Sequence, residues 1–245
     1  MKKSKILYDK KGFTVVELMI ATLVFSLVLL IAMGALIQMS KLYYKGITNA
    51  RTQELSRNVM ANISQGIQFS RQTVIPPSLN STNPAIAIVD PPATEITNTT
   101  GFFCVGPKRY SYVLDRKLSL NPDASPVASR KKESRHVLWV DTPANGCAGN
   151  LSPTAAVMSQ ENPCAALINA CSDGVELMIE NTRLTRISLV ESSAGSRLWA
   201  ISIGVAYGDD DLLVSDGTRY VCEGSISVSQ FCGISELSST VLRRL

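Results

Sequence analysis

The longest apolar segment of the chain lies near its N-terminus and constrains the fold more than any other feature. It follows the sequence Lys10-Lys11-Gly12, and after Glu17 no charged side chain occurs until Lys41. A run of about 24 apolar residues is long enough to cross a bilayer, which takes ~20 residues. A cleaved secretory signal has a shorter apolar core of roughly 7–15 residues, followed by a small-residue cleavage site. The segment therefore predicts a membrane-spanning helix.

The single carboxylate at the head of this run requires a partner. A charged side chain inside a bilayer costs on the order of 2–3 kcal/mol or more, so Glu17 is expected to have a function. The sequence Gly12-Phe13-Thr14 stands just before it, after a leader rich in lysine. This arrangement resembles the class III signal of type IV prepilins and of the related pseudopilins of type II secretion. A plain membrane anchor explains neither Glu17 nor the Gly-Phe junction.

The resemblance implies how the N-terminus is processed. Prepilin peptidase is expected to cut between Gly12 and Phe13 and to methylate the new amine of Phe13, which keeps its positive charge. Glu17 would then neutralise that amine, in its own chain or in a neighbouring subunit. Opposite charges attract strongly in apolar surroundings, and an unpaired charge is costly there. The pair would set the register of a subunit that docks into a filament.

The distribution of charge indicates the orientation in the membrane. The leader, residues 1–12, holds five lysines and one acidic residue, and without it the chain is formally neutral. A positive flank stays cytoplasmic, so the bulk of the chain is expected in the periplasm and later on an extracellular pilus. Because the basic excess belongs to the leader, the net charge does not support nucleic-acid binding.

The rest of the sequence predicts an α+β chain of the type IV pilin-like class, with a long N-terminal helix packed on an antiparallel sheet that carries inserted loops and disulfides. The expected parts are the leader at 1–12, a transmembrane or filament-core helix at 13–38, its amphipathic continuation at 39–72, and a β-rich head at 73–245. In the continuation, apolar residues recur every four positions and are expected to pack on the head. These residues are Leu55, Val59, Ile63 and Ile67.

Strand signals fill much of the head. The segment 198–207 alternates apolar and polar residues, the period of a sheet with one buried face. Segments 175–179 and 184–190 flank a short polar stretch and are predicted to form a hairpin. Further strands are expected at 85–89, 101–106, 110–114, 136–140, 219–222 and 237–242.

Six cysteines occur, and all of them follow the apolar segment. Their number is even and their spacing is not that of a zinc site, so disulfides are expected and no metal centre is. Fifteen pairings are possible, of which Cys222 with Cys232 is favoured. A helix predicted to begin at Asn162-Pro163 would hold Cys164 and Cys171 about 10 Å apart, too far for a bond. They would then pair elsewhere, with Cys104 and Cys147 as candidates.

No constellation of catalytic residues occurs, so neither an enzyme nor a cofactor is expected. His136 is the only histidine and suits a structural or surface role. The oxygen-rich cluster Asp209, Asp210 and Asp211 is a weak calcium candidate, and a solvated loop is preferred because its spacing is not that of an EF-hand. The basic run at 130–135 is likewise expected to be a solvated loop, since no aromatic stacking partner for nucleic acid adjoins it.

The tail, residues 230–244, is similar to the end of PilW-type minor pilins. This implies a low-copy pilin that helps to initiate or cap a type IV pilus. The implied partners are prepilin peptidase, other minor pilins, the major pilin and the inner-membrane assembly machinery. Two alternatives stay open: a J-type minor pseudopilin of type II secretion, and an adhesive pilus-tip subunit that binds ligands through its loops at 115–170.

Overall fold

The computed structural model describes residues 12–70, 74–75, 100–118, 134–143, 155–163, 174–192, 197–215, 220–223 and 229–244. The chain divides into two compact units, residues 1–43 and residues 44–245. The first unit contains the start of a long helix. The second contains the remainder of that helix and all of the strands.

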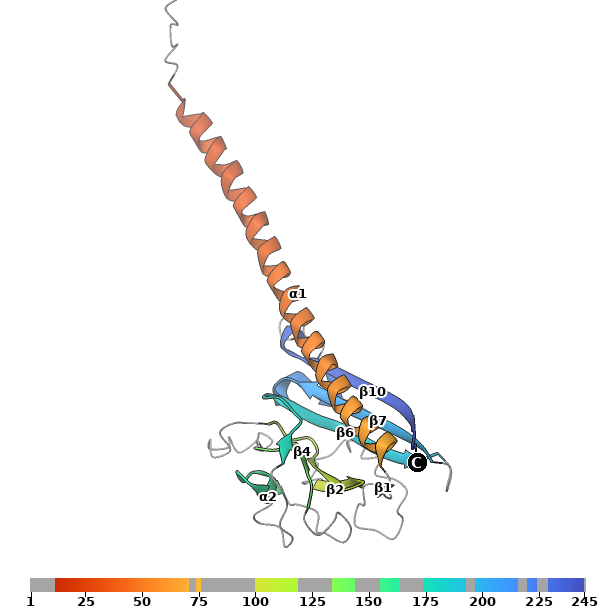
Figure 1. The fold of residues 1–245 in the computed structure, drawn as a ribbon. Helices are drawn as coiled ribbons and strands as arrows, with labels where there is room; N and C mark the ends of the chain where they lie inside the picture. The colour runs from red at the N-terminus through yellow and green to blue at the C-terminus, as the bar shows by residue number, and fades with distance from the viewer. Residues whose placement is uncertain are drawn as a thin grey trace, which may run out of the picture. The chain divides into compact units, whose positions relative to one another are not determined.

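The long helix, α1, extends over Val15–Phe69, within the helix expected at 13–38 and its continuation at 39–72. In the first unit, every residue from Gly12 to Ser40 is exposed to solvent. The helix continues without a break through Gly34 and Gly46. The glycines therefore lower the helix propensity but do not end the helix (Figure 1).

In the second unit, one face of α1 is buried. The predicted stripe Leu55, Val59, Ile63 and Ile67 is at most 5% exposed, which confirms the four-residue pattern. Polar residues with small side chains extend this face toward the start of the unit. Each of their hydroxyl groups donates to the carbonyl oxygen four residues earlier, which allows them to be buried. They are Thr48, Thr52 and Ser56.

Five strands form an antiparallel sheet in chain order. They are β1 (Val74–Ile75), β2 (Thr100–Val105), β3 (Lys108–Val113), β4 (Leu138–Asp141) and β5 (Val175–Glu176). Strands β2 and β3 form a hairpin in which Thr100 pairs with Val113 and Val105 pairs with Lys108. Gly106 adopts φ +62° in the turn, a backbone conformation that glycine adopts without steric cost.

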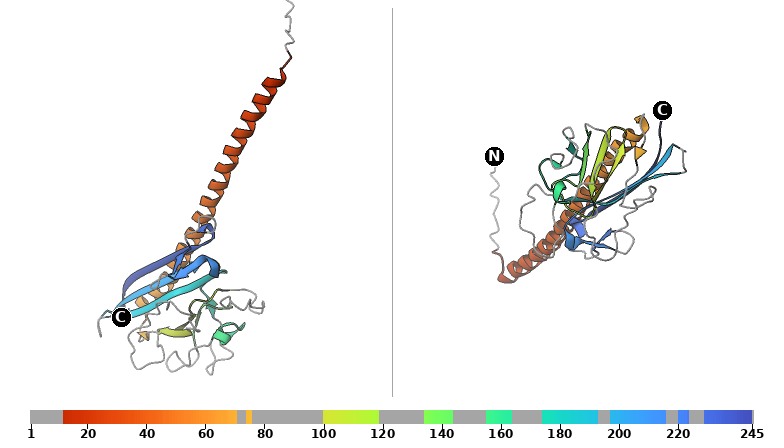
Figure 2. Two further views of the ribbon diagram at one scale, coloured as in Figure 1. Left: turned by 180° about the vertical axis from the view of Figure 1, so that it is seen from behind. Right: turned by 90° about the horizontal axis from the view of Figure 1, so that it is seen from below.

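Three longer strands form a second antiparallel sheet in the order β10-β7-β6. They are β6 (Thr182–Glu191), β7 (Leu198–Tyr207) and β10 (Gly233–Leu242). Figures 1 and 2 show this sheet alongside the second half of α1. A two-stranded ribbon joins β8 (Leu213–Ser215) to β9 (Tyr220–Cys222). The short helices are α2 (Ala155–Met158), η2 (Asp210–Leu212) and η3 (Ser229–Phe231).

Two glycines make room where elements cross closely. A Cβ atom at Gly204 would lie 2.6 Å from Thr185 Oγ1, beside the β-bulge that interrupts the pairing of β6 with β7. A Cβ atom at Gly233 would lie 2.9 Å from Thr52 Oγ1. The last strand therefore begins in direct contact with α1.

The two sheets enclose one core with the buried face of α1. The predicted alternation in β7 is confirmed from Trp199 to Val205, whose side chains at alternate positions are buried. Phe103 and Tyr110 stack in the first sheet with ring centroids 4.8 Å apart. The fold is thus the expected pilin-like α+β arrangement, with its strands divided between separate sheets.

The predicted hairpin between residues 175–179 and 184–190 is wrong. Strand β5 pairs with β4, and β6 pairs with β7 in the other sheet. The carboxylate of Glu176 explains this choice, because it accepts hydrogen bonds from the backbone N–H groups of Val137 and Leu138 beside β4. The predicted strand at 85–89 and the body of the helix predicted to begin at Asn162-Pro163 lie outside the described residues.

Candidate functional site

The start of α1 forms a capping box. The backbone N–H and the side-chain hydroxyl of Thr14 both donate to Oε2 of Glu17, each at 2.9 Å. The N–H of Glu17 in turn donates to Oγ1 of Thr14 at 3.3 Å. Thr14 precedes the first helical residue, so it is the N-cap and Glu17 is the third residue of the helix. This reciprocal pattern satisfies donors that would otherwise lack a partner at a helix start.

The capping box fixes the position of the carboxylate. Glu17 lies in the first turn, where the helix dipole favours a negative charge. The sequence contains the signal for this arrangement, a threonine followed three residues later by a glutamate before an apolar run. For Glu17, only pairing with the N-terminal amine was predicted. Its hydrogen bonds with Thr14 were not.

The predicted cleavage junction lies just outside the helix. Gly12, Phe13 and Thr14 have no regular secondary structure, and the Phe13 side chain is 87% exposed. Proteases act on extended and accessible backbone, which a helix does not offer. The Gly12–Phe13 bond is therefore accessible to an enzyme, one residue ahead of the N-cap.

Comparison with known proteins supports the same interpretation. Residues 8–33 match the prokaryotic N-terminal methylation motif. This motif indicates a type IV pilin-like protein. The motif is that of prepilin-like proteins, which prepilin peptidase processes and which are generally structural proteins. No curated protein and no solved structure matches the chain.

The helix that carries this motif has the length and composition of a membrane anchor. Among the described residues, α1 is the one helix that is long and apolar enough to cross a membrane, with a mean hydropathy of 2.7 over its most apolar window. None of that window is buried within the protein. Together with the methylation motif, this indicates anchoring in the inner membrane before assembly.

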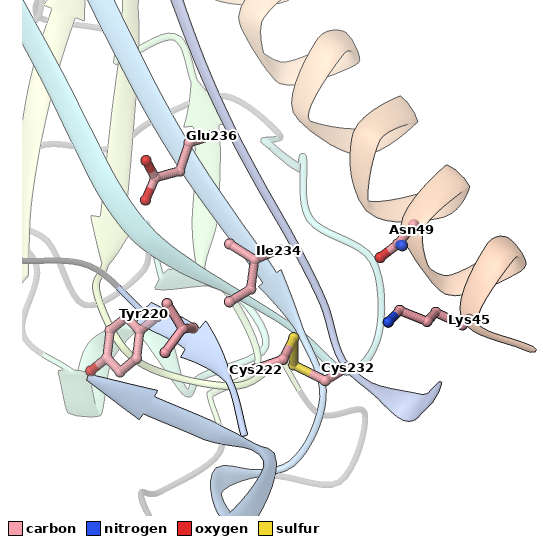
Figure 3. A pocket seen from close by; sticks show the side chains of 8 residues that line it. Lys45, Asn49, Tyr220, Cys222, Cys232, Ile234 and Glu236 are labelled. Atoms are coloured by element: carbon pink, nitrogen blue, oxygen red, sulfur yellow. A yellow bond between two sulfur atoms is a disulfide. The ribbon is translucent and has the colours of Figure 1, made fainter. Parts of the chain in front are cut away.

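A disulfide joins the ribbon to the start of the last strand. Cys222 at the end of β9 is bonded to Cys232, just before β10, with Cα atoms 5.8 Å apart. This is the pairing that the sequence analysis favoured, and Figure 3 shows it. Cys104 is also in a disulfide. The predicted pairings of Cys147, Cys164 and Cys171 lie outside the described residues.

A cavity of about 430 Å³ lies beside this disulfide. The helix contributes Lys45 and Asn49, and the strands contribute side chains of both polar and apolar character (Figure 3). Besides the two cysteines these are Tyr220, Val221, Ile234 and Glu236. The lining combines one cation with one anion and contains no nucleophile paired with a base, so it offers no catalytic arrangement.

The acidic cluster has a protein partner. The carboxylate of Asp209 forms an ion pair with the ammonium group of Lys117, while Asp211 is exposed and Asp210 belongs to the turn η2. Among the described residues, no group of three His, Cys, Asp or Glu side chains is arranged to hold a metal ion. Lys117 supplies the positive charge beside Asp209 that a cation would otherwise provide.

His136 lies in a structural environment. Its ring packs edge-on against Trp139 with centroids 4.2 Å apart, and Nδ1 lies 3.5 Å from the Glu176 carboxylate. That carboxylate already accepts N–H groups of the β4 region, so the histidine belongs to the junction of β4 and β5. The structure therefore gives His136 packing contacts and no substrate-facing position among the described residues.

The buried ion pair between Arg109 and Asp141 was not predicted from the sequence. Arg109 and Asp141 are paired directly across β3 and β4, with Nε–Oδ1 at 3.0 Å and Nη2–Oδ2 at 2.6 Å. Both side chains are at most 1% exposed. Residues 32 positions apart give no sequence signal for such a pair, because only the strand register brings them together.

Proposed function

We propose that this pilin-like protein is a minor pilin that contributes to the initiation or assembly of a type IV pilus. The observation that carries the proposal is the combination of an accessible Gly12–Phe13 bond, a positioned carboxylate at Glu17 and a fully exposed apolar helix behind it. The apolar first part of the helix, up to Ser40, has no buried residue and therefore requires an apolar environment. The lipid bilayer supplies this before assembly, and helices of other subunits supply it in a filament.

The geometry supports a specific step in assembly. Cleavage before Phe13 creates a positively charged amine close to a carboxylate that Thr14 already holds in place. In the apolar filament core this amine is costly unless it is paired. Glu17 of the same or a neighbouring subunit provides the opposite charge, and the pairing fixes the axial position of the incoming helix.

The assignment to minor pilins rests on the similarity of the tail, residues 230–244, to PilW-type sequences. In the structure this segment forms η3 and β10. Since a secretion pseudopilin would use the same helix start, the helix does not distinguish a minor pilin from a pseudopilin.

The phenotype of a strain that lacks this protein distinguishes the two roles. Its deletion is expected to reduce piliation and leave exoprotein release intact. Lost exoprotein release with normal pili would assign the chain to type II secretion instead, and normal pili with lost adherence would assign it to an adhesive role.

The capping box allows the charge of Glu17 to be tested separately from its hydrogen bonds. Glu17→Gln retains an oxygen that can accept from Thr14 but removes the charge, whereas Thr14→Ala removes the cap and keeps the charge. We expect normal cleavage of all variants, and strongly reduced recovery of Glu17→Ala and Glu17→Gln in sheared pili. Thr14→Ala is expected to be affected much less. If Glu17→Ala were recovered in sheared pili at the wild-type level, the assembly role of Glu17 would be refuted. If only Glu17→Gln were recovered at that level, Glu17 would act through its hydrogen bonds to Thr14 and not through its charge.

A further inference from the structure

Two exposed aromatic rings meet at the beginning of the second unit. The rings of Tyr44 in α1 and Phe231 in η3 have centroids 6.1 Å apart and are 52% and 48% exposed. Large apolar side chains that are exposed together commonly mark an interaction site. This contact joins residues that are far apart in sequence, so it belongs to the folded head and not to the helix alone.

The position of Tyr44 along the chain places this pair near the membrane. The apolar run ends at Lys41, and Tyr44 follows three residues later. Consecutive Cα atoms are 3.8 Å apart, so the Cα atom of Tyr44 lies within about 11 Å of that of Lys41 for any course of the chain. The headgroup region adds roughly 5–8 Å on each side of the hydrocarbon core. With Lys41 at the edge of the hydrocarbon core, the Cα atom of Tyr44 lies at the level of the headgroups or just beyond it.

The chemistry of these residues suits that layer. Tyrosine is enriched at membrane interfaces because its ring is apolar and its hydroxyl is polar. The neighbouring Lys45 is exposed and carries a positive charge that complements lipid phosphates. Phe231 adds apolar area next to Tyr44.

The protein holds Phe231 in this position. The following residue, Cys232, is bonded to Cys222. The carbonyl oxygen of the preceding residue, Gln230, lies 3.4 Å from the Thr48 hydroxyl, whose one proton is shared between this carbonyl and that of Tyr44, 2.9 Å away. Both neighbours of Phe231 are thus fixed, one of them to α1 itself. A surface that is held in this way keeps its two rings together without a partner protein.

We propose that Tyr44, Lys45 and Phe231 form an interfacial surface that docks the head on the phospholipid headgroups of the outer leaflet while the protein is anchored in the inner membrane. Contact of this surface with lipid restricts how the head moves before assembly. It concerns the anchored state only, so it does not depend on which filament the protein later joins.

Fluorescence quenching of the full chain in phospholipid vesicles tests this surface. A Phe231→Trp variant is reconstituted with lipids that carry a nitroxide on the headgroup, and the wild-type chain gives the baseline of the two native tryptophans. The matched control is Phe69→Trp. Phe69 is also exposed, at 70%, and lies at the other end of the same part of α1, about 37 Å from Tyr44 at 1.5 Å per residue.

We expect the fluorescence added by Phe231→Trp to be quenched by the headgroup nitroxide, and that added by Phe69→Trp to be unaffected. Quenching should not change when the protein is diluted in the vesicles, because lipid and not a second copy covers the surface. Adding Lys45→Glu should reduce it. Equal quenching of the two variants, or quenching of neither, would overturn the proposal. If Phe231→Trp loses the Cys222–Cys232 bond, Tyr44→Trp is measured instead with the same two outcomes.

Discussion

The two halves of α1 are both helical, but they differ in where their apolar side chains find apolar partners. Before Tyr44, the first half is almost entirely exposed and apolar. The second half places one stripe in the core and turns charged side chains such as Arg51, Glu54 and Arg57 outward. The second half finds its apolar partners within its own chain, whereas the first half requires lipid or other subunits. One continuous helix therefore combines a folded-domain element with an element that is completed only by its surroundings.

The largest difference between the halves is expected from matched isoleucine variants. Ile63 is 0% exposed and Ile31 is 66% exposed. Ile63→Ala should lower the free energy of unfolding of the head by about 2–5 kcal/mol, since it removes buried methyl groups and leaves a cavity. Ile31→Ala should leave it unchanged. Denaturant unfolding of the full chain in detergent micelles measures both, and a comparable loss for Ile31→Ala would contradict the comparison.

Alkaline pH should act on the second half through two buried tyrosines. Burial raises the pKa of Tyr110 and of Tyr112 to about 12. Since both groups titrate near pH 10 in the unfolded chain, the head should be fully stable below pH 10. It should lose on the order of 2 kcal/mol per ring as the pH approaches 12.

The control for this pH dependence is Tyr110→Phe. The Tyr110 hydroxyl donates to Oδ1 of Asn62 in α1 at 2.9 Å, so its deprotonation also breaks a contact with the helix. The variant should show a shallower loss of stability between pH 10 and pH 12 by unfolding at stepwise pH. An unchanged slope would mean that Tyr110 does not report on the contact with α1.

A smaller effect is expected where the last strand crosses the helix. Gly233→Ala places a methyl group 2.9 Å from Thr52 Oγ1 and should destabilise the head by about 1–3 kcal/mol. Thr52→Ala removes the crowded oxygen, so the double variant should recover part of the loss. Thermal unfolding of the single and double variants gives the coupling. Strict additivity would show that the two residues do not crowd each other.

The smallest effect is expected at the start of the first half. Thr14→Ala removes the N-cap and should cost about 1 kcal/mol of helix stability, confined to the first turn. Thr22→Ala is the matched control, because its hydroxyl bonds only to the carbonyl of Met19 within the helix. Faster amide hydrogen exchange at the first turn in Thr14→Ala but not in Thr22→Ala is the expected outcome. Equal exchange rates in both variants would show that the capping box does not stabilise the first turn.

The sequence was informative wherever one residue spacing determines one structure. The four-residue stripe of α1, the alternation of β7 and the short loop between Cys222 and Cys232 each predicted what the structure contains. The Gly12-Phe13 junction is also a local signal, and its cleavage stays a prediction. These features depend on neighbours within one turn, one strand or one loop.

The remaining features depend on contacts that sequence spacing does not encode. Strand β5 joins β4 because Glu176 caps the N–H groups of Val137 and Leu138, and Arg109 meets Asp141 only through the register of β3 and β4. The capping box of Thr14 and Glu17 differs from these, because it is local and its motif is visible in the sequence. The charge of Glu17 in an apolar run predicts a function, and the spacing of Thr14 and Glu17 predicts the cap.

Strand β10 links parts of the head that lie far apart in the sequence. This strand contains residues 233–242, pairs with β7 along ten residue positions and begins against Thr52 of α1. Beyond it, the N–H of Arg244 donates to the carbonyl of Gln68, close to the end of the helix. The first and last parts of the chain are therefore structural neighbours. A chain that stops before β10 therefore leaves β7 with β6 as its one neighbour in this sheet, and the described head is complete only when residues 233–242 are in place.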